Sequence, residues 1–110
     1  HTHTHTHTHT HTFLAPEVLK GEPMDEKADI YSLGMILWEL QARAKPFEGE
    51  NFMTATMNIL QGTRPTIPAK TPSGYSKVIK KCWDADPKAR HTLEGILSFF
   101  DGELGAEMDV

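Results

Sequence analysis

The sequence predicts a small all-α domain built around one central helix. The segment from about Glu26 to Arg43 carries apolar residues on almost every face, which is typical of a helix buried in a core. No convincing strand pattern occurs, and three prolines between Thr63 and Gly74 argue against regular structure there. The chain has 110 residues, enough for a single small domain.

Capping residues indicate where the first helices begin and end. Pro16 suits the first position of a short helical turn. Asp25 is the expected N-cap of a helix over residues 26–43. Asn51 is expected to cap a further helix over residues 51–61, with Gly62 as its stop.

Two more helices are expected towards the C-terminus. The segment 75–83 is amphipathic, with its lysines away from its apolar face. Thr92 is the expected cap of a last helix over residues 93–100, ended by Asp101 and Gly102. The acidic residues 103–110 are expected to form a frayed tail.

The first twelve residues differ in kind from the rest of the chain. Residues 1–12 are six copies of His-Thr. A dipeptide repeat has no hydrophobic periodicity, so we expect it to be disordered and to stem from a translated CA microsatellite. The alternative is metal capture, because an extended repeat places its imidazoles on one side, where they would bind Zn²⁺ or Ni²⁺ loosely. No carboxylate stands nearby to support such a site, so no metal ligands are assigned.

Composition excludes several classes of function. The formal charge is −4 and like charges form no long block, which argues against nucleic acid or an anionic membrane as a main partner. No apolar run approaches the roughly 20 residues that span a bilayer. The single cysteine, Cys82, excludes an internal disulfide and fits a cytoplasmic location.

Four motifs follow one another in a specific order. They are Ala15-Pro16-Glu17, D-x-Y-S-x-G-x-x-x-W-E from Asp29, G-x-R-P-x-I-P from Gly62, and C-W-x-x-D-P-x-x-R from Cys82. Together they resemble the C-terminal lobe of a protein kinase catalytic domain, from the A-P-E motif onward. The resemblance covers residues 13–102, and it implies helices EF, F, G, H and I of the protein-kinase-like fold.

Two of these motifs indicate which groups of kinases the chain resembles. The G-x-R-P-x-I-P and Cys-Trp segments are found in tyrosine kinases and in the tyrosine-kinase-like group. Leu14 and the segment 25–29 favour the latter group, most of whose members phosphorylate serine or threonine. The resemblance therefore implies a signalling parent protein that uses ATP and Mg²⁺ to phosphorylate protein Ser/Thr, with Tyr as the less favoured acceptor.

The resemblance implies structural rather than catalytic roles for the matched residues. Glu17 is expected to pair with Arg90 and so tie the end of the activation segment to the lobe. Asp29, which in kinases accepts N–H groups of the catalytic loop, is expected to be exposed or protonated because that loop does not occur in this chain. The matched structural positions are Ala15, Pro16, Glu17, Asp29, Gly34, Trp38, Trp83 and Arg90.

Other side chains are assigned to packing. Gly34 is expected to permit the close approach of another element, and Trp83 to be a packing anchor. His91, the histidine outside the repeat, is expected to face solvent. The residues assigned to the core of the central helix are Tyr31, Gly34, Ile36, Trp38 and Leu40.

The motifs that perform phosphoryl transfer do not occur in residues 1–110. These are the glycine-rich loop, the phosphate-binding lysine with its glutamate, the catalytic aspartate with its asparagine, and the D-F-G aspartate. No catalytic, ATP-binding or metal residue is therefore assigned, and the chain alone is expected to be inactive.

The alternative function is a standalone module that binds proteins through the helix expected over residues 51–61, which is helix G in the resemblance. Phe52, Met53 and Met57 are its candidate contact residues, because methionine makes adaptable contacts. The expected partners are a protein substrate or regulator and, in the parent kinase, the N-terminal lobe and the catalytic loop.

Overall fold

The computed structural model describes the backbone of residues 14–108 and the side chains of residues 14–102. Within that range it contains five α-helices, one short 3₁₀ turn and no strand, which confirms the predicted all-α class. The predictions for residues 1–12 lie outside the described residues. The elements are α2 (Pro16–Leu19), α3 (Glu26–Ala42), α4 (Phe52–Leu60), α5 (Ser73–Cys82), η2 (Pro87–Ala89) and α6 (Leu93–Met108).

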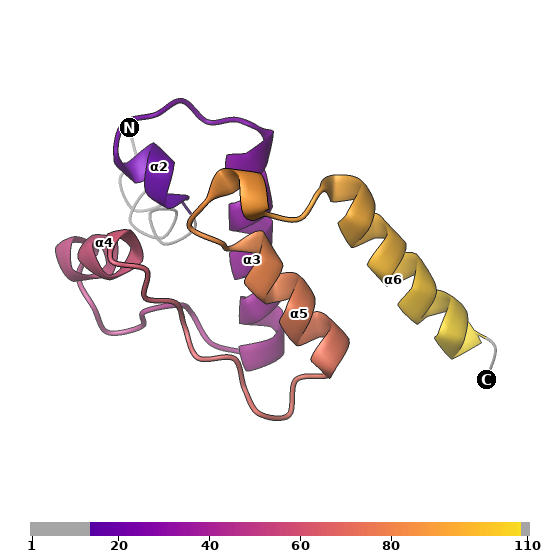
Figure 1. Cartoon of the computed structure of the whole chain (residues 1–110). Helices are drawn as coiled ribbons and strands as arrows, with labels where there is room; N and C mark the ends of the chain where they lie inside the picture. Colours follow the sequence, from indigo (N-terminus) through magenta and orange to yellow (C-terminus); the bar gives the residue numbers. More distant parts are fainter. Residues whose placement is uncertain (1–13, 109–110) are drawn as a thin grey trace, which may run out of the picture.

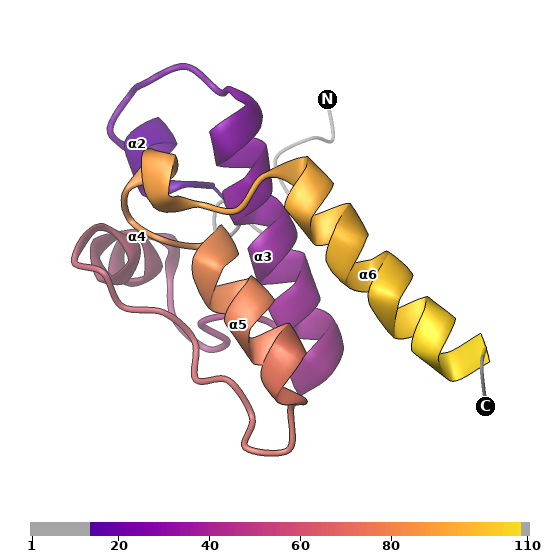
Figure 2. The same cartoon turned by 45° about the vertical axis from the view of Figure 1, so that its right-hand side comes forward.

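Helix α3 is the central element, as the sequence predicts. Figures 1 and 2 show α5 running alongside it, α2 and α4 together on one side, and α6 on the other. The Oδ1 atom of Asp25 accepts a hydrogen bond of 2.9 Å from the N–H of Ala28 and so caps the helix. The helix ends at Ala42, and the residue that follows, Arg43, has a φ of 55°, the left-handed conformation common after a helix. The predicted boundaries are confirmed to within one residue.

A glycine sets the distance between α3 and α5. A Cβ atom on Gly34 would lie 2.6 Å from the Cβ of Cys82, closer than two such atoms can approach. Glycine costs a helix about 1 kcal/mol relative to alanine, so its presence in α3 is explained by this contact. Ile79 and Cys82 are fully buried on α5, and burial raises the pKa of the Cys82 thiol to about 11. The predicted role of Gly34 is confirmed.

Two tryptophans anchor the core. Trp38 is buried on α3, and its Nε1–H donates a hydrogen bond of 2.9 Å to the carbonyl oxygen of Thr66 in the loop between α4 and α5. Trp83 is buried directly after α5, as predicted. The buried core comprises Ala15, Ala28, Ile30, Tyr31, Met35, Leu37, Trp38, Ile59, Val78, Ile79, Cys82, Trp83 and Ile96.

The prediction that Ile36 and Leu40 belong to the core is wrong. Ile36 is 43% exposed and Leu40 is 67% exposed. Both lie on one face of α3, because residues four apart in a helix are neighbours. The helix is apolar on nearly all sides, but the described residues cover only part of its circumference.

The boundaries of the last two helices also differ from the prediction. Helix α5 starts at Ser73, two residues early, and its first turn is closed by a 3.0 Å bond from the N–H of Ser76 to the carbonyl of Pro72. Thr92 caps α6 as predicted, accepting a 3.0 Å bond from the N–H of Gly95. Helix α6 does not stop at Gly102, however, but runs to Met108. Gly102 and Gly105 each cost about 1 kcal/mol relative to alanine, but the other residues over 103–108 are good helix formers, so the helix continues.

An aromatic cluster joins α6 to α5. The ring of Tyr75 meets the rings of Phe99 and Phe100 edge-on, with centroids 5.1 and 5.8 Å away. A Cβ on Gly74 would lie 2.8 Å from a ring carbon of Phe99, so this glycine also permits close packing. The cluster fixes the first half of α6 against the N-terminal end of α5.

Replacing Gly34 by alanine is expected to destabilise the chain by about 1–3 kcal/mol, because the new methyl group overlaps Cys82. The free energy of unfolding in urea measures this. Gly102→Ala is the matched control, since nothing lies within 4 Å of a Cβ there and alanine favours the helix by about 1 kcal/mol. A Gly34→Ala chain as stable as the wild type would contradict the packing described.

Candidate functional site

The site is built around a buried pair of opposite charges. Arg90 donates from Nη1 to Oε2 of Glu17 at 2.7 Å and from Nη2 to Oε1 at 2.8 Å, across 73 positions of sequence. Two parallel bonds of this kind hold a carboxylate in a fixed orientation. Arg90 is 3% exposed, and Glu17 retains only a small exposed fraction. The predicted Glu17–Arg90 pair is confirmed.

The other donors of Arg90 reach two further elements. Its Nη1 donates to the carbonyl of Lys27 in α3 at 2.9 Å, and its Nε donates to the carbonyl of Asp84 after α5 at 2.8 Å. One guanidinium therefore connects α2, α3 and the α5–η2 loop. We call this group of contacts the Arg90 anchor.

Ala15 and Pro16 hold Glu17 in place for the anchor. Both are buried, and Pro16 occupies the first turn of α2. The carbonyl oxygen of Ala15 accepts bonds of 3.0 Å from the N–H groups of Val18 and Leu19, which closes the short helix. The A-P-E motif therefore supplies the bend and the helical turn that direct the carboxylate towards Arg90.

The hydrogen bonds from Arg90 lower the pKa of Glu17 below its ordinary value, although partial burial opposes this shift. A carboxyl group with a lowered folded-state pKa stabilises the fold above its unfolded-state pKa. The contribution of the anchor is therefore fully present above the ordinary pKa of 4.5 and is lost as the pH falls through the folded-state value.

Tyr31 lies between two guanidinium groups. The Cζ atoms of Arg64 and Arg90 are each 5.2 Å from its ring centroid, a distance at which cations are attracted to aromatic faces. Arg64 also donates to the carbonyls of Trp83 at 3.0 Å and Ile59 at 3.2 Å. Arg64 is the residue that sequence reasoning missed, and its place in the G-x-R-P motif was the only signal available.

The hydroxyl of Tyr31 is buried and finds no hydrogen-bond partner among the described residues. Burial is the main cause of a raised pKa for Tyr31, so the phenol stays neutral. The ring therefore acts by packing and by cation attraction.

Asp29 is not brought into the anchor. It is exposed on α3, which is one of the two alternatives that the sequence predicts for it. It lines a surface cavity of about 210 Å³ between the first turns of α3 and α6, whose apolar walls include Ile30, Leu33 and Leu93.

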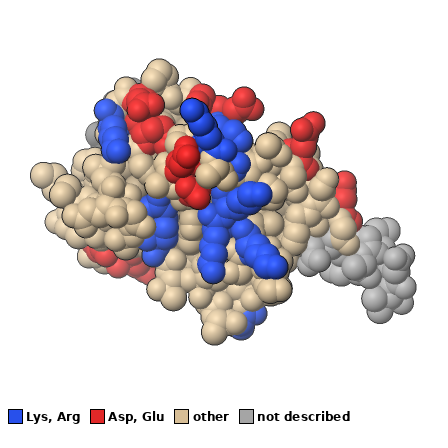
Figure 3. All heavy atoms as spheres, in the orientation of Figure 1, with Lys and Arg blue, Asp and Glu red and all other residues tan. Residues whose placement is uncertain are grey.

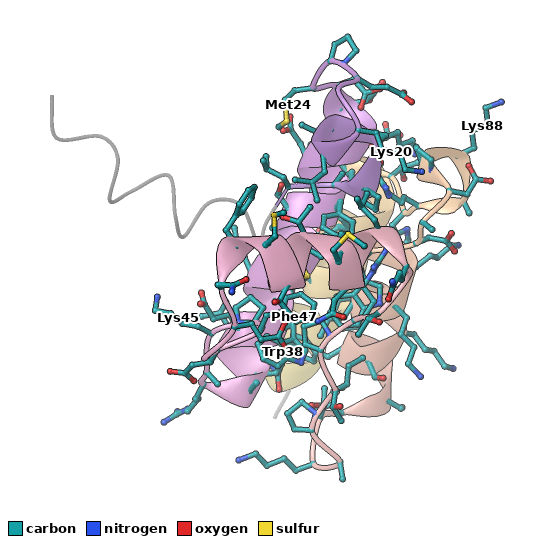
Figure 4. The ribbon with its side chains drawn as sticks, turned by 90° about the vertical axis from the view of Figure 1, so that its left-hand side faces the viewer. Lys20, Met24, Trp38, Lys45, Phe47 and Lys88 are labelled. Carbon is teal, nitrogen blue, oxygen red and sulfur yellow. The ribbon has the colours of Figure 1, made fainter. Side chains whose placement is uncertain are left out.

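The candidate partner-binding residues lie on α4. Phe52, Met53 and Met57 are 45%, 72% and 52% exposed, whereas Ala55 and Ile59 of the same helix are buried. The helix carries no charged residue, and Asn51 caps it as predicted. Figure 4 looks onto α4, with Phe47 and Trp38 beside it. An uncharged helix with exposed methionines is a surface suited to protein contact, and its use as one stays a prediction.

His91 is half-buried, so the prediction that it faces solvent is wrong. A Cβ on Gly95 would lie 2.5 Å from a carbon of its ring, which shows that the imidazole packs against the first turn of α6. Its pKa is lowered, first by burial and then by the positive charges of Lys81 and Lys27.

The described residues do not fit an ATP–Mg²⁺ site. Among them, no group of three or more His, Cys, Asp or Glu side chains is placed to hold a metal ion. The glycines that adopt positive φ, Gly21, Gly49 and Gly62, lie in separate loops and form no phosphate-binding turn. Across residues 14–108, no helix combines the length and the apolar character needed to cross a membrane.

Comparisons with known proteins identify the family. The protein kinase domain model matches residues 1–99. A serine/threonine-protein kinase/receptor of Acanthamoeba polyphaga mimivirus is 41% identical over 93 residues, which is 84% of this chain and 6% of that protein. A LIM domain-containing serine/threonine-protein kinase of Dictyostelium discoideum is 44% identical over 76% of this chain and 9% of its own length.

A third relative, the dual specificity protein kinase shkA of Dictyostelium discoideum, is 42% identical over 78% of this chain and 17% of its own length. The fold and the Arg90 anchor define a helical lobe, and the family match shows that the chain belongs to the protein kinase domain family. The chain spans less than a fifth of these three relatives.

Arg90→Leu is expected to destabilise the chain by about 3–5 kcal/mol and to lower its melting temperature sharply, because it leaves the Glu17 carboxylate without a partner in a largely buried position. Thermal unfolding followed by circular dichroism measures this. Lys45→Leu is the control, because Lys45 is 63% exposed and its 4.0 Å pair with Glu39 is worth about 1 kcal/mol or less. An unchanged melting curve for Arg90→Leu would count against the anchor.

Proposed function

We propose that this chain is a segment of a protein kinase whose parent transfers the γ-phosphoryl group of ATP to serine or threonine side chains of proteins. The family match and the names of two relatives as serine/threonine kinases support the reaction and the acceptor. A tyrosine acceptor is the alternative, and the dual specificity relative keeps it open. The observation that carries the proposal is the bidentate bond between Glu17 of the A-P-E motif and Arg90.

In the parent, the Arg90 anchor holds the end of the activation segment against the lobe. Phosphoryl transfer depends mainly on positioning and charge neutralisation, so a mobile segment near the acceptor must have one fixed end. Glu17 is that end, because its two bonds to a buried arginine leave it a single orientation. The present chain therefore contributes to catalysis by positioning the activation segment and not by reacting with the substrate.

The uncovered face of α3 supports the same proposal. Asp29, Ile36 and Leu40 are exposed along the helix, and Leu33 is only half-buried between them. An apolar helix face with one acidic residue suits a cover that is apolar and that donates N–H groups to the carboxylate. We assign this face to the catalytic loop and preceding helices of the parent kinase, and the ATP and Mg²⁺ sites to those parts.

The coding sequence upstream of the codon for Thr12 tests the proposal. We expect it to encode H-R-D and D-F-G segments in frame with the present chain, since phosphoryl transfer requires an aspartate base and a metal-binding aspartate. Sequencing of the full-length transcript measures this. A start codon that leads directly into the His-Thr repeat would contradict the proposal.

The second candidate function is a standalone interaction module that binds a protein through α4. The exposure of Phe52, Met53 and Met57 on an uncharged helix is the observation that favours it. A standalone module must be stable with the α3 face of Ile36 and Leu40 as it stands. A kinase segment instead needs the rest of the parent domain to cover that face.

Residues 13–110 expressed alone are expected to bind a hydrophobic dye and to unfold with low cooperativity, because the apolar face of α3 is exposed. Dye fluorescence and a thermal melt measure this. Ile36→Lys/Leu40→Lys should remove a large part of the dye signal, and the remainder should fall with Met53→Lys/Met57→Lys, because α4 also exposes apolar side chains. A sharp two-state transition without dye binding would favour the standalone module instead.

A further inference from the structure

Three lysines gather on the outer face of α5. Lys77, Lys80 and Lys81 stand at positions i, i+3 and i+4, so their side chains lie on neighbouring parts of the helix surface. All three are exposed, while Val78 and Ile79 are buried. Figure 3 shows Lys and Arg side chains clustered in the middle of the face on which Figure 1 places α5. We call Lys77, Lys80 and Lys81 the lysine patch.

The patch has no acidic partner among the side chains of residues 14–102. Helix α5 contains no Asp or Glu, and the salt bridges in that range are Lys45–Glu39 and Arg90–Glu17. Asp84 and Asp86 follow α5, but each has a carboxylate oxygen that accepts a backbone N–H of its own loop. Like charges at this spacing repel one another, so the patch costs the fold stability unless an anion binds to it.

The positive charge of this region extends to α3. Lys27 lies with its Nζ 3.4 Å from the carbonyl oxygens of Arg90 and His91. The backbone N–H of His91 donates a hydrogen bond of 3.2 Å to the carbonyl oxygen of Lys81, which places His91 next to the patch. An anion bound to Lys81 would therefore lie near His91, so the NMR signal of this ring serves as a reporter of binding.

We propose that the lysine patch binds a short acidic peptide segment of a protein partner. Its three ammonium groups within one helical turn match two or three carboxylates in succession. The surrounding surface favours a narrow ligand, because Figure 3 shows Asp and Glu side chains above the basic cluster and to either side of it on the same face. A narrow peptide can contact the lysines without meeting those acids.

The same surroundings disfavour larger polyanions. A membrane surface or a nucleic-acid duplex would also lie against these Asp and Glu side chains, which repel it. The chain as a whole carries a formal charge of −4, which adds to this repulsion. A single-stranded nucleic acid needs exposed aromatic rings on which its bases stack. On α5 the ring of Tyr75 is already packed against Phe99 and Phe100, and Trp83 after the helix is buried.

Fluorescence anisotropy of a labelled octaglutamate peptide with the full chain tests the proposal. We expect saturable binding that weakens when the salt concentration rises from about 20 to about 150 mM, since exposed charge pairs are screened. Lys77→Gln/Lys80→Gln/Lys81→Gln should weaken binding by about tenfold or more, from three exposed pairs of up to about 1 kcal/mol each. In the wild type, peptide should shift the NMR signal of the His91 ring, assigned with a His91→Gln variant.

The control is a charge-matched variant, Lys20→Gln/Lys45→Gln/Lys70→Gln, which removes three lysines from outside α5. It should bind the peptide within about twofold of the wild type, because screening limits the reach of exposed charges. Equal weakening in both triple variants, or no shift of the His91 signal, would overturn the proposal. So would tighter binding to phosphatidylserine vesicles or to a single-stranded oligonucleotide than to the peptide.

Discussion

The bidentate bond between Glu17 and Arg90 is the interaction on which the arrangement of this chain depends. Helix α2 has four residues and could not persist alone, because isolated short helices are unstable in water. Its position is fixed by the buried Ala15 and by a guanidinium that also binds the carbonyls of Lys27 and Asp84. The aromatic ring of Tyr31 fills the space between this guanidinium and that of Arg64.

Features that depend on local chemistry or on a complete motif could be predicted from the sequence. Asp25, Asn51 and Thr92 each cap a helix, and the A-P-E glutamate pairs with its arginine across the whole fold. The solvent exposure of apolar side chains is harder to predict from the sequence. Hydrophobicity indicates that Ile36 and Leu40 need cover, but it does not tell whether the same segment of chain provides that cover.

The other differences between prediction and structure arise where the local sequence signal is weak and tertiary packing decides the outcome. Gly102 and Gly105 do not end α6, since each costs only about 1 kcal/mol and the other residues over 103–108 are good helix formers. The sequence predicts that His91 faces solvent, yet Gly95 leaves room for its ring against α6. The contacts of Arg64 could not be foreseen, because they join loop, helix end and core residues from three parts of the chain.

A double-mutant cycle on Glu17 and Arg90 tests the central claim most directly. The free energies of unfolding of the wild type, Glu17→Ala, Arg90→Ala and the double variant give the coupling between the two side chains. The structure predicts a coupling of about 2 kcal/mol or more near neutral pH, because the pair is buried and bidentate. A coupling close to zero would contradict the account and would make α2 independent of the lobe.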